Sequence, residues 1–121
     1  MKITTKIYDV RERTYRYALD VITFLEELPD DYVSKTIGQQ LLRSATSVGA
    51  NIVEAQAASS KKDFANYYIH ALKSANESRF WLSLLRDTGK VSYERVDALL
   101  IETRELANIL ASSILTMKGK R

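Results

Sequence analysis

The sequence predicts an all-α protein that forms one domain over residues 1–121, an antiparallel up-down-up-down four-helix bundle. The chain contains only 4 Gly and 1 Pro, so few of its positions favour a turn over continued helix. Apolar side chains recur at helical spacing in four long stretches, at about residues 8–28, 33–58, 61–88 and 92–117. The connections between these stretches are short, and short connections make consecutive helices antiparallel neighbours.

The first helix is expected to follow a loose start at residues 1–6 and to stop at Pro29. Asp30 and Asp31 then supply a turn and an N-cap for the second helix. The core stripe of the first helix, with Val21 beside it, is predicted to be Tyr15, Ala18, Ile22, Leu25 and Leu28.

The second stretch, residues 33–58, is poor in charge, although 27% of the whole chain is charged. Its only charged side chains are Lys35, Arg43 and Glu54, whereas a surface helix normally carries charges opposite its apolar stripe. The predicted stripe is Ile37, Leu41, Ala45, Val48, Ile52 and Ala55. The back of the helix carries small or neutral residues, Gln39, Thr46, Ala50 and Ala57. We therefore predict a helix at the centre of the bundle whose back forms an oligomer interface.

One flank of the same helix is a polar ladder of Gln40, Arg43, Ser47, Asn51 and Glu54. Counting outward from a turn at residues 59 and 60 places Arg43 level with Asn76 and Glu77, and Glu54 near Tyr8 and Arg11. Buried charges must be paired, so an Arg43–Glu77 pair is expected. We predict a structural polar network that sets helix register, made of Arg43, Ser47, Asn51, Glu54 and Glu77. The alternative is a small-ligand or catalytic pocket around Glu54 and Glu77.

The third helix is expected to begin after Ser60, which has an acid three residues later at Asp63 in a pattern that resembles a capping box. Gly89 ends it and Ser92 caps the fourth helix. The stripe of the third helix is Phe64, Tyr68, Ala71, Ala75, Ser78, Leu82 and Leu85. That of the fourth is Val96, Leu99, Leu100, Thr103, Leu106, Leu110, Ile114 and Met117.

Up-down topology gathers basic residues at one end of the bundle, where the first helix starts, the second meets the third, and the fourth ends. We call this the basic end: Lys2, Lys6, Arg11, Arg13, Arg16, Lys61, Lys62, Lys118, Lys120 and Arg121. Against them stand Asp9, Glu12 and Asp63, so this end carries +7 and the rest of the chain −4. Such a distribution favours an anionic partner, most simply RNA or DNA. A solubilising or helix-end role for the same charges is the alternative.

The sequence does not favour an enzyme. His70 is the only histidine and there is no Cys, so no His/Cys set for zinc exists, and no Gly-rich phosphate loop appears. We expect His70 to be structural, and we expect no catalytic residue, no cofactor and no metal. The chain has neither a signal-peptide core at its start nor a run of 18 apolar residues, which predicts a cytoplasmic protein without a membrane partner.

Three segments are similar to one known family. Residues 43–54 (RSATSVGANIVE) resemble the signature of the four-helix-bundle proteins encoded in intervening sequences of large-subunit (23S) rRNA genes, and residues 60–64 (SKKDF) and 71–77 (ALKSANE) resemble its following block. Members often have Gly after the glutamate, where this chain has Ala55. The resemblance implies a left-handed antiparallel bundle that assembles into a ring, most often a homopentamer. It implies no catalytic residues.

The function of that family is loosely defined, and three hypotheses follow. The first is a homo-oligomeric bundle that binds structured RNA or another nucleic acid through the basic end. The second is a protein-interaction scaffold, since a related bundle serves as an accessory to a reverse transcriptase in diversity-generating retroelements. The third, an enzyme or small-ligand binder using the layer of Glu54 and Glu77, has the least support in the sequence.

Overall fold

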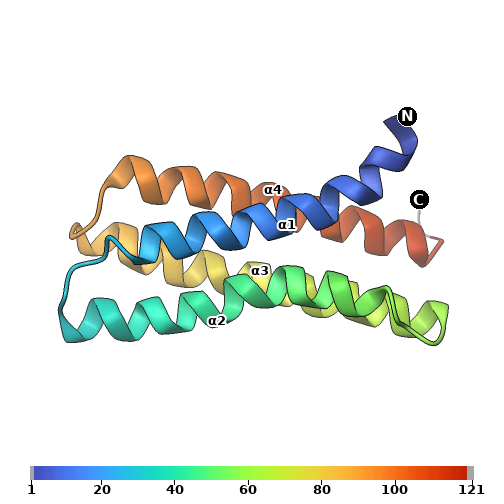
Figure 1. Ribbon diagram of the computed structural model, residues 1–121, viewed down its shortest axis with the longest axis horizontal. Helices are drawn as coiled ribbons and strands as arrows, with labels where there is room; N and C mark the ends of the chain where they lie inside the picture. The colour runs from blue at the N-terminus through green and yellow to red at the C-terminus, as the bar shows by residue number, and fades with distance from the viewer. Residues whose placement is uncertain (1, 120–121) are drawn as a thin grey trace.

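The computed structural model describes residues 2–119, and the side chains of residues 10–119. These residues form four helices and no strand: α1 (Lys2–Leu25), α2 (Tyr32–Ala55), α3 (Lys61–Thr88) and α4 (Tyr93–Met117). Figure 1 shows them side by side in alternating direction, with the start of α1, the α2–α3 turn and the end of α4 at one end of the bundle. The predicted up-down-up-down four-helix bundle is therefore confirmed. None of the described helices combines the length and the apolar character needed to cross a membrane.

Three side chains start helices where the sequence predicted them. The Asp31 carboxylate accepts a hydrogen bond from the Ser34 N–H at 2.8 Å, which begins α2. The Ser60 hydroxyl accepts one from the Asp63 N–H at 3.0 Å, and the Ser92 hydroxyl starts α4 in the same way. These bonds satisfy backbone donors that have no partner inside the helix. Gly89 ends α3 at φ 72°, in the left-handed region that glycine adopts without steric cost.

Three predicted helix boundaries were wrong. Helix α1 already begins at Lys2 instead of following a loose start, and it ends at Leu25, three residues before the predicted end. Helix α2 ends at Ala55 and not at residue 58. In both cases the chain tightens before it leaves the helix: the N–H of Leu28 donates to the Leu25 carbonyl, and that of Ala58 to the Ala55 carbonyl. Such three-residue turns commonly finish a helix.

The core stripe of α1 also differs from the prediction. Tyr15 is 65% exposed and Ile22 is 37% exposed. The residues that face the core are Val10, Thr14, Tyr17, Val21 and Phe24. This stripe was missed because two of its members carry hydroxyl groups and resemble surface residues. Both hydroxyls have internal partners, which removes the cost of burying them.

The stripes of the other three helices lie in the core largely as predicted, with Ile37 and Phe64 half-buried and Met117 exposed at the end of α4. One layer of this core is polar and connects all four helices. The Tyr17 hydroxyl lies 2.6 Å from the Thr103 hydroxyl, and the Ser44 hydroxyl lies 2.8 Å from that of Ser78. Thr103 and Ser78 also donate to carbonyls one turn earlier in their own helices. The layer sets the relative height of the helices, since a shift of one turn would leave its buried hydroxyls unpaired.

Candidate assembly and nucleic-acid surfaces

The uncharged back of α2 is open in the single chain. Gln39, Ala50 and Ala57 are exposed and Thr46 is half-buried. Two large apolar side chains lie on the same side of the helix, Leu42 and Val53, the latter 62% exposed. Burial within the bundle therefore does not account for the lack of charge along this helix.

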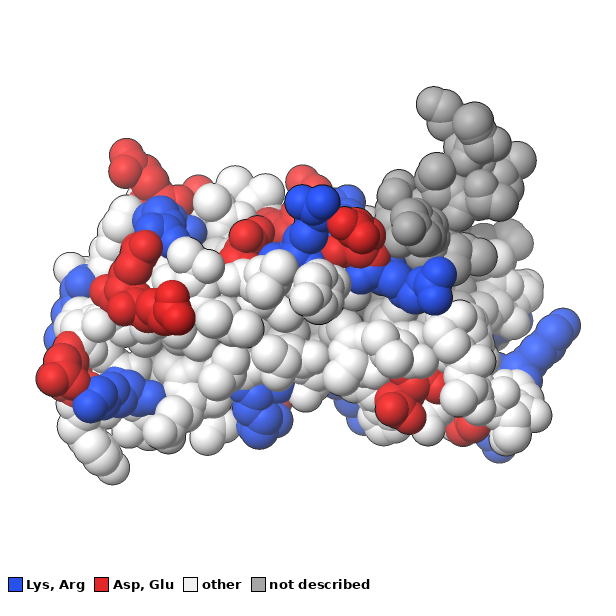
Figure 2. All heavy atoms as spheres, in the orientation of Figure 1, with Lys and Arg blue, Asp and Glu red and all other residues white. Residues whose placement is uncertain are grey.

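Helix α1 extends this surface. Its exposed apolar residues Tyr15, Leu19 and Ile22 recur every three or four positions, so they lie on one side of the helix. We call the combined surface the α1/α2 face: Tyr15, Leu19, Ile22, Gln39, Leu42, Thr46, Ala50, Val53 and Ala57. Figure 2 shows a broad band without charge where α1 and α2 lie next to each other, with charged groups above it, below it and at the ends.

Two glycines of α2 bring the two helices close enough to make this face continuous. A Cβ at Gly49 would lie 3.2 Å from the Thr14 hydroxyl oxygen, and one at Gly38 would lie 3.3 Å from Leu25 Cδ2 in α1 and 2.8 Å from Leu28 Cδ1 in the turn that follows. Beside Gly38 a hollow of about 380 Å³ adjoins this face. It is lined by Leu25, Leu28, Pro29, Asp30, Lys35, Gly38, Gln39 and Leu42.

The basic end keeps only part of its predicted charge. Arg11, Lys61, Lys62 and Lys118 are exposed there. Lys61, Lys62 and Lys118 have no ion-pair partner within residues 10–119. The side chains of Lys2, Lys6, Lys120 and Arg121 lie outside the described residues.

Arg13 and Arg16 do not present free cations. Arg13 forms two hydrogen bonds to Glu102 of α4, at 2.9 and 2.8 Å, and one to Glu105 at 2.6 Å. These carboxylates raise the pKa of Arg13 further above its usual range. Arg16 pairs with Glu12 one turn earlier at 2.8 Å. The charge of both arginines is therefore largely compensated, and of the two only Arg13 connects α1 to α4 among the described contacts.

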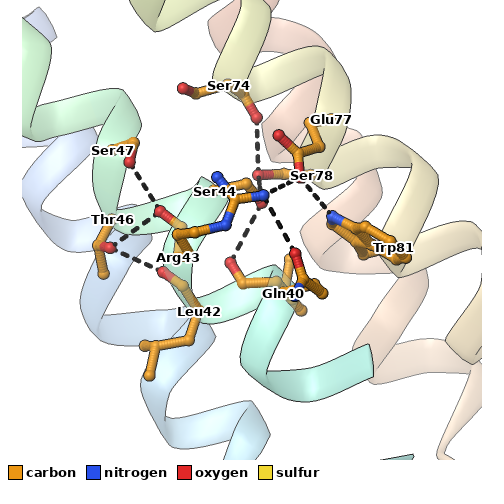
Figure 3. A network of polar contacts seen from close by, with 11 residues as sticks. Gln40, Leu42, Arg43, Ser44, Thr46, Ser47, Ser74, Glu77, Ser78 and Trp81 are labelled. Carbon is orange, nitrogen blue, oxygen red and sulfur yellow. Dashed lines mark hydrogen bonds and ion pairs between the residues drawn. The ribbon is translucent and has the colours of Figure 1, made fainter. Parts of the chain in front are cut away.

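Only part of the polar ladder of α2 contacts α3. Figure 3 shows Arg43 reaching across to Glu77 of α3, while Gln40 and the Trp81 indole N–H also contact this pair. Ser47 and Asn51 instead donate to carbonyls of their own helix, at 2.8 Å each. Glu54 was wrongly placed in the network: it is exposed, and its carboxylate has no partner among the described residues. Glu54 lies in the last turn of α2, so its carboxylate adds negative charge to the basic end.

Beneath the Arg43–Glu77 pair lies the Ser44–Ser78 contact, which was not predicted. Each of these serines directly follows a residue of the predicted pair, so the same hairpin count would have found them. Both side chains are fully buried. Small hydroxyl residues at this level let α2 and α3 approach closely.

The described residues contain no group of three His, Asp or Glu side chains that could hold a metal ion. His70 is exposed on α3. Glu77 is held by Arg43 and Trp81, and neither it nor Glu54 lines the hollow beside Gly38 or a second hollow between α1, α3 and α4. The geometry therefore gives no support to a ligand pocket around these two carboxylates.

A second hollow, of about 480 Å³, lies toward the basic end between α1, α3 and α4. We call it the end groove, and the described residues that line it are Val10, Phe64, Tyr68, Asn108, Ile109, Ser112, Ser113, Thr116 and Met117. The rings of Phe64 and Tyr68 stack with centroids 5.1 Å apart. Burial raises the pKa of Tyr68, and the positive charge of Arg11 opposes this shift only in part.

Comparisons with known proteins agree with this geometry. Residues 6–112 match the family described as 23S rRNA-intervening sequence protein. A solved structure from Bacteroides thetaiotaomicron, described as a protein with unknown function from the S23 ribosomal protein family, is 34% identical and superposes with a TM-score of 0.82. The match covers 90% of this chain and 97% of the other. Among curated proteins, none matches this chain.

Proposed function

The chain belongs to the family of 23S rRNA-intervening sequence proteins, and from this premise we propose a non-enzymatic, homo-oligomeric bundle that binds RNA through its basic end. The observation that carries the assembly part is the α1/α2 face, where apolar and small side chains are exposed without a charge among them. Monomeric proteins rarely expose continuous apolar patches of this kind without a partner. We propose the cytoplasm as the place where the protein acts, since that is where bacterial ribosomal RNA is found.

A closed ring with more than two copies needs two different surfaces on each subunit, because each copy contacts its two neighbours through different patches. The α1/α2 face is the first. The second surface that we propose lies on α3, where Phe80 is 56% exposed and Leu84 is also exposed. Phe80 packs edge-on against Trp81, with ring centroids 5.0 Å apart. The ring of five copies that the family resemblance implies is our expected assembly.

The RNA part of the proposal rests on Lys61 and Lys62. They occupy the first turn of α3, where the partial positive charge of the helix start disfavours further cations. Helix stability therefore does not account for them. Their exposed and unpaired ammonium groups are suited to phosphate oxygens, and the neighbouring Lys118 and Arg11 extend the same charge.

Light scattering on the purified protein, with absorbance read for copurified nucleic acid, tests assembly and partner class together. Ala50→Arg should reduce the assembly to smaller species, because it places a charge in the middle of the α1/α2 face. Ala98→Arg is the matched control, since Ala98 is an exposed helical alanine outside that face. An unchanged oligomer in Ala50→Arg would show that this face stays in contact with solvent.

The RNA assignment is tested with a double charge reversal, Lys61→Glu with Lys62→Glu. This variant should lose RNA while keeping its oligomeric state. The matched control reverses Lys73 and Arg79, two exposed residues on the same helix that change the net charge equally. Retention of RNA by the first variant would reject the basic end. Capture of a protein partner that survives nuclease treatment would instead favour the scaffold function.

A further inference from the structure

The end groove contains a buried tyrosine whose hydroxyl is unpaired within residues 10–119, which an ordinary surface depression does not have. Tyr68 is only 4% exposed, yet its hydroxyl has no hydrogen-bond partner among the described residues. No described buried polar atom of the protein is left both unpaired and sealed from solvent. The Tyr68 hydroxyl is therefore in contact with solvent, and Tyr68 is one of the residues that line the groove.

The rest of the groove is suited to a flat ligand with polar edges. Phe64 is half-buried and stacked on Tyr68, so aromatic surface is present at the wall. Across from α3, helix α4 supplies the Asn108 amide and the Ser113 hydroxyl, which have both donor and acceptor capacity. Ile109 and Val10 supply apolar contacts. Aromatic and apolar walls with a few polar groups are typical of small-molecule and base-binding sites.

The charges around the groove indicate that this flat ligand is anionic as a whole. Lys61 and Lys62 come directly before the Phe64 turn of α3, and Lys118 directly follows Met117. Arg11 is exposed and directly follows Val10, which lines the groove. Among the side chains of residues 10–119, the acidic groups at this end are Glu12, Glu54 and Asp63, and Asp63 is held by Ser59 in the α2–α3 turn. An apolar slot with a basic rim matches a nucleobase that is attached to phosphate.

We propose that the end groove binds an unpaired base of single-stranded RNA, while the basic rim holds the adjoining phosphates. This inference rests on the proposed function and narrows its ligand from RNA in general to RNA with unstacked bases. A base inside a duplex presents neither its faces nor its pairing edge, so paired RNA reaches only the rim. Aromatic stacking accepts any base, and the Asn108 amide and Tyr68 hydroxyl add contacts to base edges.

The test compares a labelled single-stranded RNA of mixed sequence with the blunt duplex of the same sequence, by fluorescence anisotropy at one salt concentration. The single strand should bind about tenfold more tightly, which is within the range of one stacked base. Ser113→Leu fills the groove and should remove most of this preference. Ser83→Leu is the matched control, because Ser83 is a half-buried helical serine outside the groove. Tyr68→Phe keeps the ring and should weaken single-strand binding about threefold, as expected for one lost hydrogen bond.

A second measurement locates the base directly. Single-stranded RNA that contains 4-thiouridine should photo-crosslink to the segments of residues 63–73 and 105–118, as mapped by mass spectrometry. Equal affinity for duplex and single strand, or a preference unchanged in Ser113→Leu, would overturn the groove assignment. Loss of binding in the Lys61 and Lys62 reversal would then still support the proposed function. If the wild-type protein bound neither form of RNA, both proposals would fall.

Discussion

The buried hydroxyl layer allows a prediction in which two substitutions at one hydrogen bond have unequal effects. The Tyr17 hydroxyl and the Thr103 hydroxyl are 2.6 Å apart and almost fully buried. Thr103 also donates to the Leu99 carbonyl at 2.6 Å, so Tyr17 is the donor in the bond between the two side chains. Burial raises the pKa of Tyr17 and keeps this donor protonated.

Removing the donor leaves only an acceptor lone pair on Thr103 without a partner, because Thr103 keeps its bond to the backbone. Tyr17→Phe should therefore lower the free energy of unfolding by about 1 kcal/mol, the usual net value of one hydrogen bond. Thr103→Val keeps the volume but leaves the Tyr17 O–H in the core without this acceptor. Its cost should be larger, about 2 kcal/mol, toward the upper part of the range for an unsatisfied buried group.

Urea unfolding of both single variants and the double variant, at one protein concentration, measures these values. The double variant should cost less than the sum of the singles, because no unpaired donor is left when both hydroxyls are absent. Equal effects of the two single substitutions, or strict additivity, would show that the Tyr17 hydroxyl has a second acceptor of equal quality. Among the described residues, the other hydroxyl that lowers the pKa of Tyr17 is that of Ser78.

Three further predictions concern other parts of the molecule. Gly49→Val should destabilise the fold by about 1–3 kcal/mol, seen as a lower Tm, since even a Cβ there would lie 3.2 Å from the Thr14 hydroxyl oxygen. The hydrogen bond from the Ser34 N–H lowers the pKa of Asp31 in the folded protein. The Asp31 carboxylate therefore stabilises the fold fully above the ordinary pKa of an aspartate, and this stabilisation is lost as the pH falls through the lower pKa of the folded state. Asp31→Asn should flatten this part of the acid unfolding curve. If Lys61 contacts one phosphate, Lys61→Gln should reduce the slope of log affinity against log salt by about 0.7, whereas Arg13→Gln should leave the slope unchanged.

The bundle itself could be predicted because its signals are local. Ser60, Ser92 and Gly89 mark helix ends through their own backbone chemistry, and the stripes of α2, α3 and α4 contain enough Leu, Val, Ile and Ala to be recognised. The stripe of α1 could not be found in this way. Thr14 and Tyr17 look like surface residues in the sequence. Their burial is understood only once the partners are known, which are the Arg11 carbonyl for Thr14 and the Thr103 hydroxyl of α4 for Tyr17.

Some features of the candidate surfaces could likewise be predicted from the sequence, and others could not. The lack of charge on the back of α2 is a property of one helix, so it could be read from the sequence. The Arg43–Glu77 pair could be predicted by counting residues outward from the turn between α2 and α3. The state of a surface cation depends on the helix beside it. Arg13 appeared to belong to the basic end, yet it pairs with Glu102 on α4, and a contact between the first and last helices has no local signature. The end groove is formed by three helices and was not predicted for the same reason.

The two proposed surfaces constrain each other through symmetry. The α1/α2 face runs along the side of the bundle, whereas the basic end lies at one tip (Figure 1). If copies join side by side around an axis parallel to their helices, cyclic symmetry keeps them all in the same direction and places every basic end on one side of the ring.

A long single strand can then contact several subunits at once, so affinity should rise steeply with strand length until all copies are engaged. Ala50→Arg, which disrupts the ring, should remove this length dependence while retaining weak binding of short strands, and titrations with RNAs of graded length measure it. An Ala50→Arg protein that is monomeric yet still shows the full length dependence would separate RNA binding from assembly and refute this arrangement.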